Sequence, residues 1–144
     1  MSEDTYVPIL EFCKDVAEHH IDMVSPTKIG VGAVVVKDDK IVGVGWRWTK
    51  VLQQEPYKDI TYHAEHCAIM NAGPLCKDAT LYVTMEPCTK RIPYEWATPD
   101  CCCDLIIKSG IKRVVYLEED NGLGTGGEEY LKNRGIEVEK SNDY

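Results

Sequence analysis

Residues 29 to 48 read IGVGAVVVKDDKIVGVGWRW. The segment 29–36 is an unbroken, mostly β-branched apolar run, which is typical of a strand buried on both faces. The segment KDDK at 37–40 predicts a turn, after which residues 41–48 form the second strand of a hairpin. Glycines at 30, 32, 43 and 45 would weaken both strands, so we expect a helix or a ligand to approach their backbones closely.

Helices and strands are expected on either side of this hairpin. A 3.6-residue apolar period from residue 6 to residue 24 predicts an amphipathic helix that ends at Pro26. Residues 50–62 show no clear period and are expected to form a loop. Further helices are predicted at about 63–71, 102–109 and 128–133, and further strands at 80–84, 113–117 and 136–139. Thr98 and Pro99 are expected to be the N-cap and first position of the helix that contains residues 102–109.

The resulting order, αββαβαβαβ, fixes the expected class of fold. Helical crossovers between strands imply parallel neighbours, whereas the hairpin implies an antiparallel pair. The prediction is therefore an α/β fold, a three-layer αβα sandwich with a five-stranded mixed sheet. No internal repeat or linker interrupts the pattern, so residues 1–144 are expected to form a single domain.

Composition and charge narrow the classes of partner. The net charge is −8, and the acidic residues are scattered, which argues against binding of a nucleic-acid backbone. No apolar run approaches the ~18 residues needed to cross a bilayer, and the first residues are acidic where a secretory signal would be basic. The seven cysteines are an odd number that includes an adjacent triplet, which favours a reducing compartment over a disulfide framework. We therefore expect a cytoplasmic protein.

Metal-binding residue types gather between residues 61 and 109. A catalytic zinc ion needs three protein ligands and one open position, and it prefers histidine nitrogen and cysteine sulfur. His63, Cys88 and Cys102 could supply these ligands, each at a helix start or just after a strand, where a helix dipole favours thiolate. Glu65 follows in the first helical turn, where it could take a proton from a bound water. A pairing of His63 with His66 or Cys67, one helical turn later, is the alternative arrangement.

The His-x-Glu step, followed by Pro-Cys and a later cysteine, resembles the zinc-dependent cytidine deaminase-like superfamily. The resemblance extends over nearly the whole chain, because the superfamily has the same αββαβαβαβ order. It implies one zinc ion per chain held by His63, Cys88 and Cys102, with Glu65 as the catalytic proton carrier. Many members have two residues between the cysteines, whereas residues 89–101 separate them here.

The choice of Cys102 within the triplet also comes from this resemblance. In the superfamily the ligand opens a helix and lies eight residues before the glycine or arginine of a Ser-Gly-Ile or Ser-Arg-Ile step. Ser109-Gly110-Ile111 is that step here, which selects Cys102 and leaves Cys101 as the runner-up. A shift by one residue would rotate the ligand by about 100° around the helix.

The run YVTMEPCTKR at 82–91 is most similar to the pyrimidine deaminases of riboflavin biosynthesis, in particular the fungal-type diaminohydroxyphosphoribosylaminopyrimidine deaminases. This resemblance implies hydrolysis of an exocyclic amine on a diaminopyrimidine that carries a ribosylamino or ribitylamino phosphate. Arg47, Lys90 and Arg91 are the tentative cations for the phosphate. Arg47 stands where many members have Asn or His, and the spacer 89–101 is where we expect substrate identity to be decided.

Two other readings stay open. A nucleobase, nucleoside, deoxycytidylate or tRNA deaminase would keep the chemistry and change the substrate, and the acidic charge makes tRNA the least favoured of these. A non-catalytic, zinc-stabilised binding module would need a fourth protein ligand, such as Cys101 or Cys103 beside Cys102. The superfamily commonly forms dimers or tetramers, so the resemblance also implies a homo-oligomer.

Overall fold

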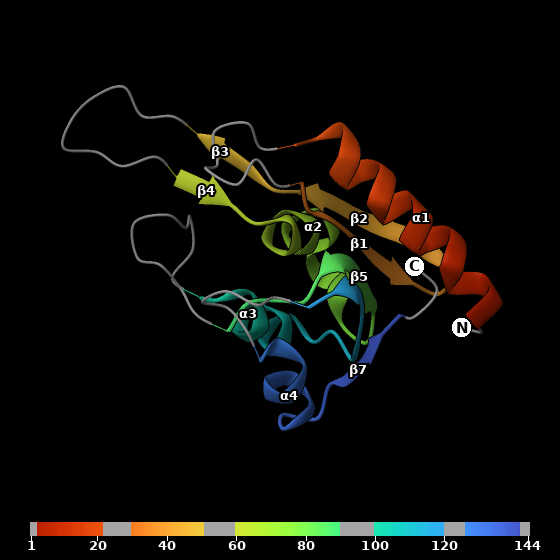
Figure 1. The fold of residues 1–144 in the computed structure, drawn as a ribbon. Helices are drawn as coiled ribbons and strands as arrows, with labels where there is room; N and C mark the ends of the chain where they lie inside the picture. Colours follow the sequence, from red (N-terminus) through yellow and green to blue (C-terminus); the bar gives the residue numbers. More distant parts are fainter. Residues whose placement is uncertain (1–2, 22–29, 51–59, 90–99, 120–125, 142–144) are drawn as a thin grey trace.

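The structure is a computed structural model that describes residues 3–21, 30–50, 60–89, 100–119 and 126–141, with side chains described from residue 8 onward (Figure 1). Its elements, in chain order, are α1 (Glu3–His19), β1 (Gly32–Lys37), β2 (Lys40–Trp46), β3 (Trp48–Lys50), β4 (Ile60–Tyr62), α2 (Ala64–Ala72), the 3₁₀ turn η1 (Gly73–Cys76), β5 (Thr80–Met85), α3 (Cys102–Ser109), β6 (Arg113–Glu118), α4 (Gly127–Lys132) and β7 (Glu137–Lys140).

The main sheet confirms the predicted topology. Its strand order is β2-β1-β5-β6-β7. Strand β1 pairs antiparallel with β2 and β5, whereas β5, β6 and β7 are parallel neighbours. The two parallel pairs are those joined through α3 and α4, because a parallel partner can be reached only by a crossover. The turn between β1 and β2 is formed by Asp38 and Asp39, both at positive φ, as a two-residue hairpin requires.

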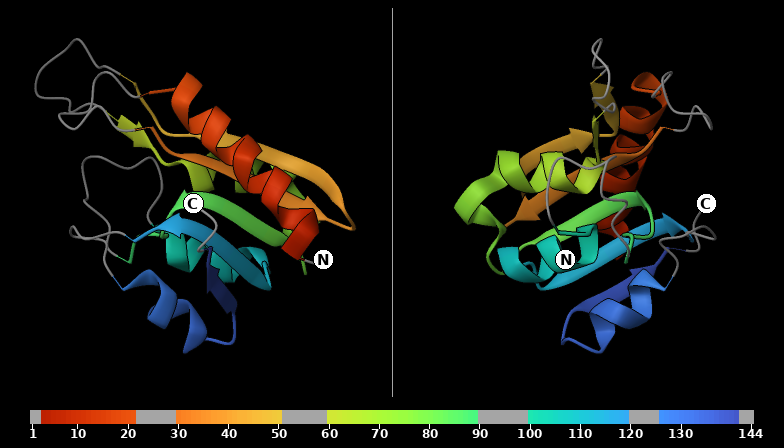
Figure 2. Two further views of the ribbon diagram at one scale, coloured as in Figure 1. Left: turned by 45° about the vertical axis from the view of Figure 1, so that its right-hand side comes forward. Right: turned by 90° about the vertical axis from the view of Figure 1, so that its left-hand side faces the viewer.

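Helices cover both faces of this sheet, which confirms the three-layer prediction. Figure 2 shows α1 on one face, with α2 and α3 on the other. Side chains alternate along the central strands accordingly. One core cluster lies between α1 and the sheet, and it consists of Leu10, Cys13, Val34, Val36, Tyr82, Val115 and Leu117. The other includes Val35, Leu81, Val83, Val114 and Tyr116, which pack against buried residues of α2, α3 and α4.

The glycines of the hairpin confirm the predicted close approach, and helices are what approach them. A Cβ atom on Gly32 would lie 2.4 Å from the carbonyl oxygen of Cys13 in α1. A Cβ atom on Gly45 would lie 2.4 Å from the carbonyl oxygen of Ala64 in α2. No side chain fits at either distance, so both helices sit directly on the backbone of the hairpin.

Three details of the prediction were wrong. The first helix ends at His19 rather than near Pro26, because the rings of His19 and His20 contact the carbonyl oxygens of Asp15 and Val16 at 2.7 and 2.9 Å in its last turn. Pro26 itself lies outside the described residues. Helix α3 begins at Cys102 with Cys101 as its N-cap, rather than with Thr98 and Pro99.

The third difference is a second, two-stranded sheet in place of the expected loop. Strand β2 ends at Trp46, and β3 pairs antiparallel with β4, whose residues were expected to be irregular. Their side chains supply the reason, because the rings of Trp48 and Tyr62 stack with centroids 4.3 Å apart. Among the described residues, no helix has the length and apolar character needed to cross a membrane.

Candidate metal centre

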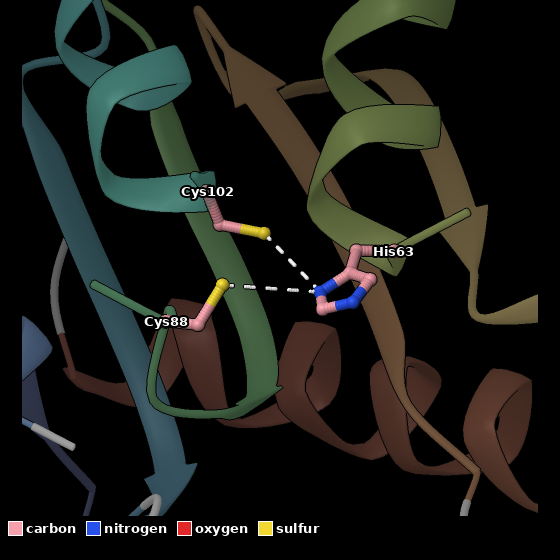
Figure 3. A group of neighbouring side chains, drawn as sticks. All are labelled: His63, Cys88 and Cys102. Atoms are coloured by element: carbon pink, nitrogen blue, oxygen red, sulfur yellow. Dashed lines mark hydrogen bonds between the residues drawn. The ribbon is translucent and has the colours of Figure 1, made fainter. Parts of the chain in front are cut away.

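Three side chains from separate parts of the chain meet near the carboxyl end of β5 (Figure 3). His63 is the N-cap residue of α2, Cys102 is the first residue of α3, and Cys88 follows β5. The Nδ1 atom of His63 lies 3.5 Å from the Cys102 sulfur and 3.9 Å from the Cys88 sulfur. All three potential ligand atoms lie within 4.8 Å of one another. The positions at helix starts and after a strand are those that the sequence predicted.

These distances fit a tetrahedral zinc site. Zinc bonds of about 2.0–2.1 Å to nitrogen and about 2.3 Å to sulfur, at tetrahedral angles, place the two ligand atoms about 3.6 Å apart. Burial, the charge of Arg47 and the neighbouring His66 together lower the pKa of His63 to about 3. Its imidazole is therefore neutral at physiological pH, which leaves a nitrogen lone pair for a metal ion.

The surroundings of the Cys102 sulfur are a second sign of fit. The hydrogen bond with Cys88, burial and the nearby Glu65 carboxylate raise the pKa of Cys102 well above its ordinary value. These neighbours favour the protonated thiol when no cation is bound. A divalent cation reverses this balance, because its charge deprotonates a coordinating thiol outright. Two buried sulfurs and a carboxylate thus suit a cation in their midst.

The other members of the cysteine triplet have different contacts. The Cys101 sulfur accepts a hydrogen bond from the Asp104 amide at 3.4 Å, which caps α3. The Cys103 thiol donates to the carbonyl oxygen of Pro87 at 3.4 Å. Within the part of the chain that the structure describes, the set of His63, Cys88 and Cys102 is the candidate group of three or more metal-binding residues.

The alternative ligands of His63 lie elsewhere. His66 and Cys67 line a groove of about 300 Å³ together with Trp46, Trp48 and Tyr62. His66 is one residue past Glu65 on α2, and its ring contacts that of Tyr62 with centroids 6.3 Å apart. Neither residue joins the group whose ligand atoms converge on the His63 Nδ1 atom.

Glu65 occupies the position that the sequence predicted, in the first turn of α2. It is only 4% exposed and lines a cavity of about 70 Å³ that also contains His63 and Cys88. Its carboxylate is close enough to Cys102 to raise the pKa of that thiol. A buried carboxylate beside both the metal ligands and a cavity is suitably placed to exchange protons with a molecule bound there.

Of the three tentative substrate cations, the structure describes one. Arg47 lines the same cavity, between β2 and β3, and its backbone amide donates to the Val31 carbonyl oxygen at 3.1 Å. Lys90 and Arg91 lie outside the described residues, as does the 90–99 part of the spacer.

Glu86 also lines this cavity, and it was not among the predicted site residues. Its side chain is 7% exposed and lines the cavity with Val31 and Met85. A signal for Glu86 was available, because it is a carboxylate that directly follows a buried strand and precedes the Pro87-Cys88 step.

Comparisons with known proteins agree with this geometry. Residues 5–118 match the family model described as the cytidine and deoxycytidylate deaminase zinc-binding region. The chain is 50% identical over 111 residues to the riboflavin biosynthesis protein RibD of Aquifex aeolicus, covering 76% of this chain and 27% of that protein. It is 39% identical over 110 residues to a diaminohydroxyphosphoribosylamino-pyrimidine deaminase of Buchnera aphidicola, covering 75% of this chain and 65% of that one.

A solved structure shows the same fold. The RibD structure from Acinetobacter baumannii superposes with a TM-score of 0.72 at 30% sequence identity, over 95% of this chain and 35% of that chain. The present chain thus spans about a quarter of the length of the Aquifex relative and about a third of the Acinetobacter protein.

Proposed function

The chain belongs to the cytidine and deoxycytidylate deaminase family, and on that premise we propose that it is a zinc-dependent hydrolytic deaminase of an aminopyrimidine. The reaction consumes one water, replaces an exocyclic amine of the ring by oxygen and releases ammonia. The observation that carries the proposal is the convergence of the His63 nitrogen and two cysteine sulfurs beside a cavity that also contains a buried Glu65.

Each ligand has a defined part in holding the metal. His63, Cys88 and Cys102 would hold zinc through Nδ1 and two sulfurs, which leaves a fourth position open. When bound in such a three-ligand site, zinc lowers the pKa of water from about 15.7 toward about 7, so that a nucleophile is available at neutral pH. The contacts of Cys101 and Cys103 with Asp104 and Pro87 support the catalytic reading over a structural site with four protein ligands.

Glu65 is proposed as the proton carrier. Its carboxylate would accept a proton from the attacking water and pass it to the ring nitrogen. It would then accept the second proton of that water from the new hydroxyl group on the ring carbon and deliver it to the departing amine. Because Glu65 is buried at the cavity, bulk water does not compete with these transfers. Positioned proton transfer of this kind contributes roughly 10²–10⁴-fold to a rate.

A diaminopyrimidine of riboflavin biosynthesis is the substrate we favour. The support comes from the named relatives, which include a RibD protein and a diaminohydroxyphosphoribosylamino-pyrimidine deaminase. Arg47 in the cavity supplies a guanidinium that can bind a phosphate in a bidentate manner, with Lys90 and Arg91 as further proposed cations. An Arg47→Ala change should raise KM for a phosphorylated substrate more than for its dephosphorylated form. An equal effect on both would remove Arg47 as the phosphate ligand.

Ammonia release tests the activity directly. The purified protein should be assayed, with its zinc content measured, on a panel of riboflavin-pathway diaminopyrimidines, cytosine, cytidine, deoxycytidylate and adenosine-containing tRNA. We expect release from a diaminopyrimidine ribosyl or ribityl phosphate. Release from deoxycytidylate or another panel member instead would assign the protein a different substrate class. Release from no member of the panel would refute the proposal that it is a deaminase.

Glu65→Gln separates the enzyme from a zinc-binding module. We expect this variant to keep stoichiometric zinc and the thermal stability of the wild type while ammonia release falls by roughly 10²–10⁴-fold or more. Undiminished release would remove Glu65 from the catalytic step. Loss of zinc in the variant would instead make Glu65 a ligand.

We also propose that the protein acts on a small molecule in the cytoplasm and that it forms a homo-oligomer. Trp46, Trp48 and Met70 are large apolar side chains, 37%, 41% and 65% exposed, that line one groove beside α2. An exposed apolar surface of this kind is suited to contact with another protein surface. Light scattering on the purified protein tests the oligomeric state, since a monomeric mass at micromolar concentration would contradict a homo-oligomer.

A further inference from the structure

Cys88 is the one metal ligand that does not belong to a helix cap or a helix. It lies in the segment 86–89, which has no regular structure and directly follows β5. The residue is nevertheless 8% exposed, and its sulfur is in place near His63. Contacts with other elements must therefore fix the position of this thiol.

Helix α3 holds the segment from one side. The backbone amide of Cys103 donates to the carbonyl oxygen of Cys88 at 3.1 Å. The Cys103 thiol donates to the carbonyl oxygen of Pro87 at 3.4 Å, and Cys103 is completely buried. Cys103, which directly follows the ligand Cys102 in the sequence, thus binds the backbone of the other ligand, Cys88.

Helix α4 and strand β6 hold the segment from the other side. The amide of Glu86 donates to the carbonyl oxygen of Glu118 at 2.7 Å, which extends the β5–β6 pairing by one step. The Glu86 carboxylate accepts a hydrogen bond of 2.8 Å from the backbone amide of Glu128, in the first turn of α4. A carboxylate is well placed there, because the first amides of a helix have no partner within the helix.

Gly127 brings α4 into direct contact with the same segment. A Cβ atom at this residue would lie 2.0 Å from the carbonyl oxygen of Pro87 and 3.1 Å from its carbonyl carbon. Gly127 is not among the glycines with positive φ, so space rather than backbone conformation excludes a side chain. Any larger residue must displace either α4 or the Pro87-Cys88 step.

Helix α4 is itself anchored to the elements around the site. The Tyr130 hydroxyl donates to the Asp104 carboxylate in α3 at 2.6 Å, and the Tyr116 hydroxyl of β6 donates to the Glu128 carboxylate at 3.2 Å. Leu131 is completely buried in the core. These contacts tie α4 to α3, β6 and the core, although the described lining of the cavity includes no residue from it.

We propose that Glu86, Cys103, Gly127 and Glu128, which we call the Cys88 clamp, are positioning residues that fix the Cys88 thiol for zinc. The inference rests on the metal site of the proposed function and is independent of the substrate. It assigns a role to Cys103, and it makes α4, which follows the last ligand by about two dozen residues, a determinant of metal affinity.

Zinc affinity, measured by competition with a chromogenic chelator, tests the Cys88 clamp without any substrate. We expect Glu86→Ala, Cys103→Ala and Gly127→Ala each to weaken zinc binding by roughly 10–100-fold, as is typical for residues that orient a metal ligand. The visible spectrum of the cobalt(II)-substituted protein should change as well, because a displaced sulfur alters the coordination geometry.

Matched variants separate positioning from a general loss of structure. Cys103→Ser keeps a hydrogen-bond donor and Glu86→Gln keeps an acceptor, so both should bind zinc within about threefold of the wild type, well short of the 10–100-fold losses above. Glu129→Ala changes an exposed residue in the same turn of α4 and should have no effect on affinity or on the cobalt spectrum.

Three results would overturn the proposal. Alanine variants that fold and bind zinc as the wild type does, with an unchanged cobalt spectrum, would show that the Cys88 clamp does not position the ligand. The proposal would also fail if both Cys103→Ser and Glu86→Gln bound zinc as weakly as the corresponding alanine variants. If Gly127→Ala does not fold, the alanine and conservative variants of Cys103 and Glu86 are sufficient for the test. A wild type that binds no zinc would refute the proposed function itself, and this inference with it.

Discussion

Cys101, Cys102 and Cys103 are consecutive, yet each sulfur has a different chemical environment. Cys102 turns toward His63, Cys101 accepts from the Asp104 amide, and Cys103 donates to Pro87. The rotation of about 100° per helical residue explains this separation. The resemblance selects Cys102 through its distance from Gly110, whereas the partners of the other two sulfurs depend on contacts that carry no sequence signature.

The N-cap role of Cys101 gives a prediction that also tests the ligand assignment. We expect Cys101→Ser to keep one zinc per chain, because a serine oxygen caps the Asp104 amide at least as well as sulfur does. Cys101→Ala should lower the free energy of unfolding by about 0.5–2 kcal/mol, the usual cost of losing an N-cap, while zinc stays bound. Urea unfolding and metal analysis of the purified variants measure both quantities.

Cys102→Ser is the matched comparison for these variants. We expect it to lose zinc, because serine is a poor ligand for this metal. Zinc that stays with Cys102→Ser and leaves with Cys101→Ser would reverse the choice that the resemblance suggested.

The hairpin of β1 and β2 illustrates what is predictable for an element. Its turn, its strands and the close approach at its glycines all follow from local sequence, and the structure confirms them. The β3–β4 pair was missed because three-residue strands are too short to show alternation and because Trp48 finds its partner Tyr62 fourteen residues later. The early end of α1 depends on histidine side chains that contact its carbonyl groups, which periodicity does not report.

The close approach of a helix to Gly45 and to Gly32 can be tested by substitution. A methyl group at Gly45 would meet the backbone of α2, which carries Glu65 and follows His63, whereas a methyl group at Gly32 would meet α1, which carries no proposed site residue. We expect both Gly→Ala variants to lose about 1–3 kcal/mol of unfolding free energy, because each overpacks a helix against a strand. Only Gly45→Ala should also weaken zinc binding, since it displaces a metal ligand.

Zinc competition on the folded fraction of each variant, alongside denaturant unfolding, separates the two effects. Equal zinc affinities for the two variants would show that the position of α2 on the hairpin does not control the ligand geometry. Weaker zinc binding by Gly32→Ala but not by Gly45→Ala would contradict the assignment of the metal site to the side of the sheet that α2 covers.

At the scale of the whole molecule, the topology explains why the site lies where it does. Residue Cys88 follows β5, α3 begins with Cys102 before the chain crosses to β6, and α2 begins beside His63. This element order brings the ligands into one neighbourhood, because crossover helices begin at the carboxyl ends of parallel strands. The support from α4 could not be predicted, since it depends on a contact between Glu86 and Glu128, 42 residues apart.

We expect bound zinc to raise the stability of the whole fold. Ligand binding to the folded state alone stabilises it by about 4 kcal/mol at a free concentration 1,000 times Kd. For a chain of this size, that corresponds to a rise of roughly 10 °C in Tm. Zinc also binds cysteines of the unfolded chain, so the measured rise in Tm between chelator-treated and zinc-loaded protein should stay below this value.

Two cysteine variants make the zinc prediction specific to the site. Cys88→Ala and Cys67→Ala leave equal numbers of cysteines, so zinc binding to their unfolded chains should be equal. Cys67 lies in the groove with Trp48 and Tyr62, away from the convergent ligand atoms. Differential scanning calorimetry should therefore show the zinc-dependent rise in Cys67→Ala and none in Cys88→Ala. The opposite pattern would mean that the metal binds through the alternative arrangement of His63 and Cys67.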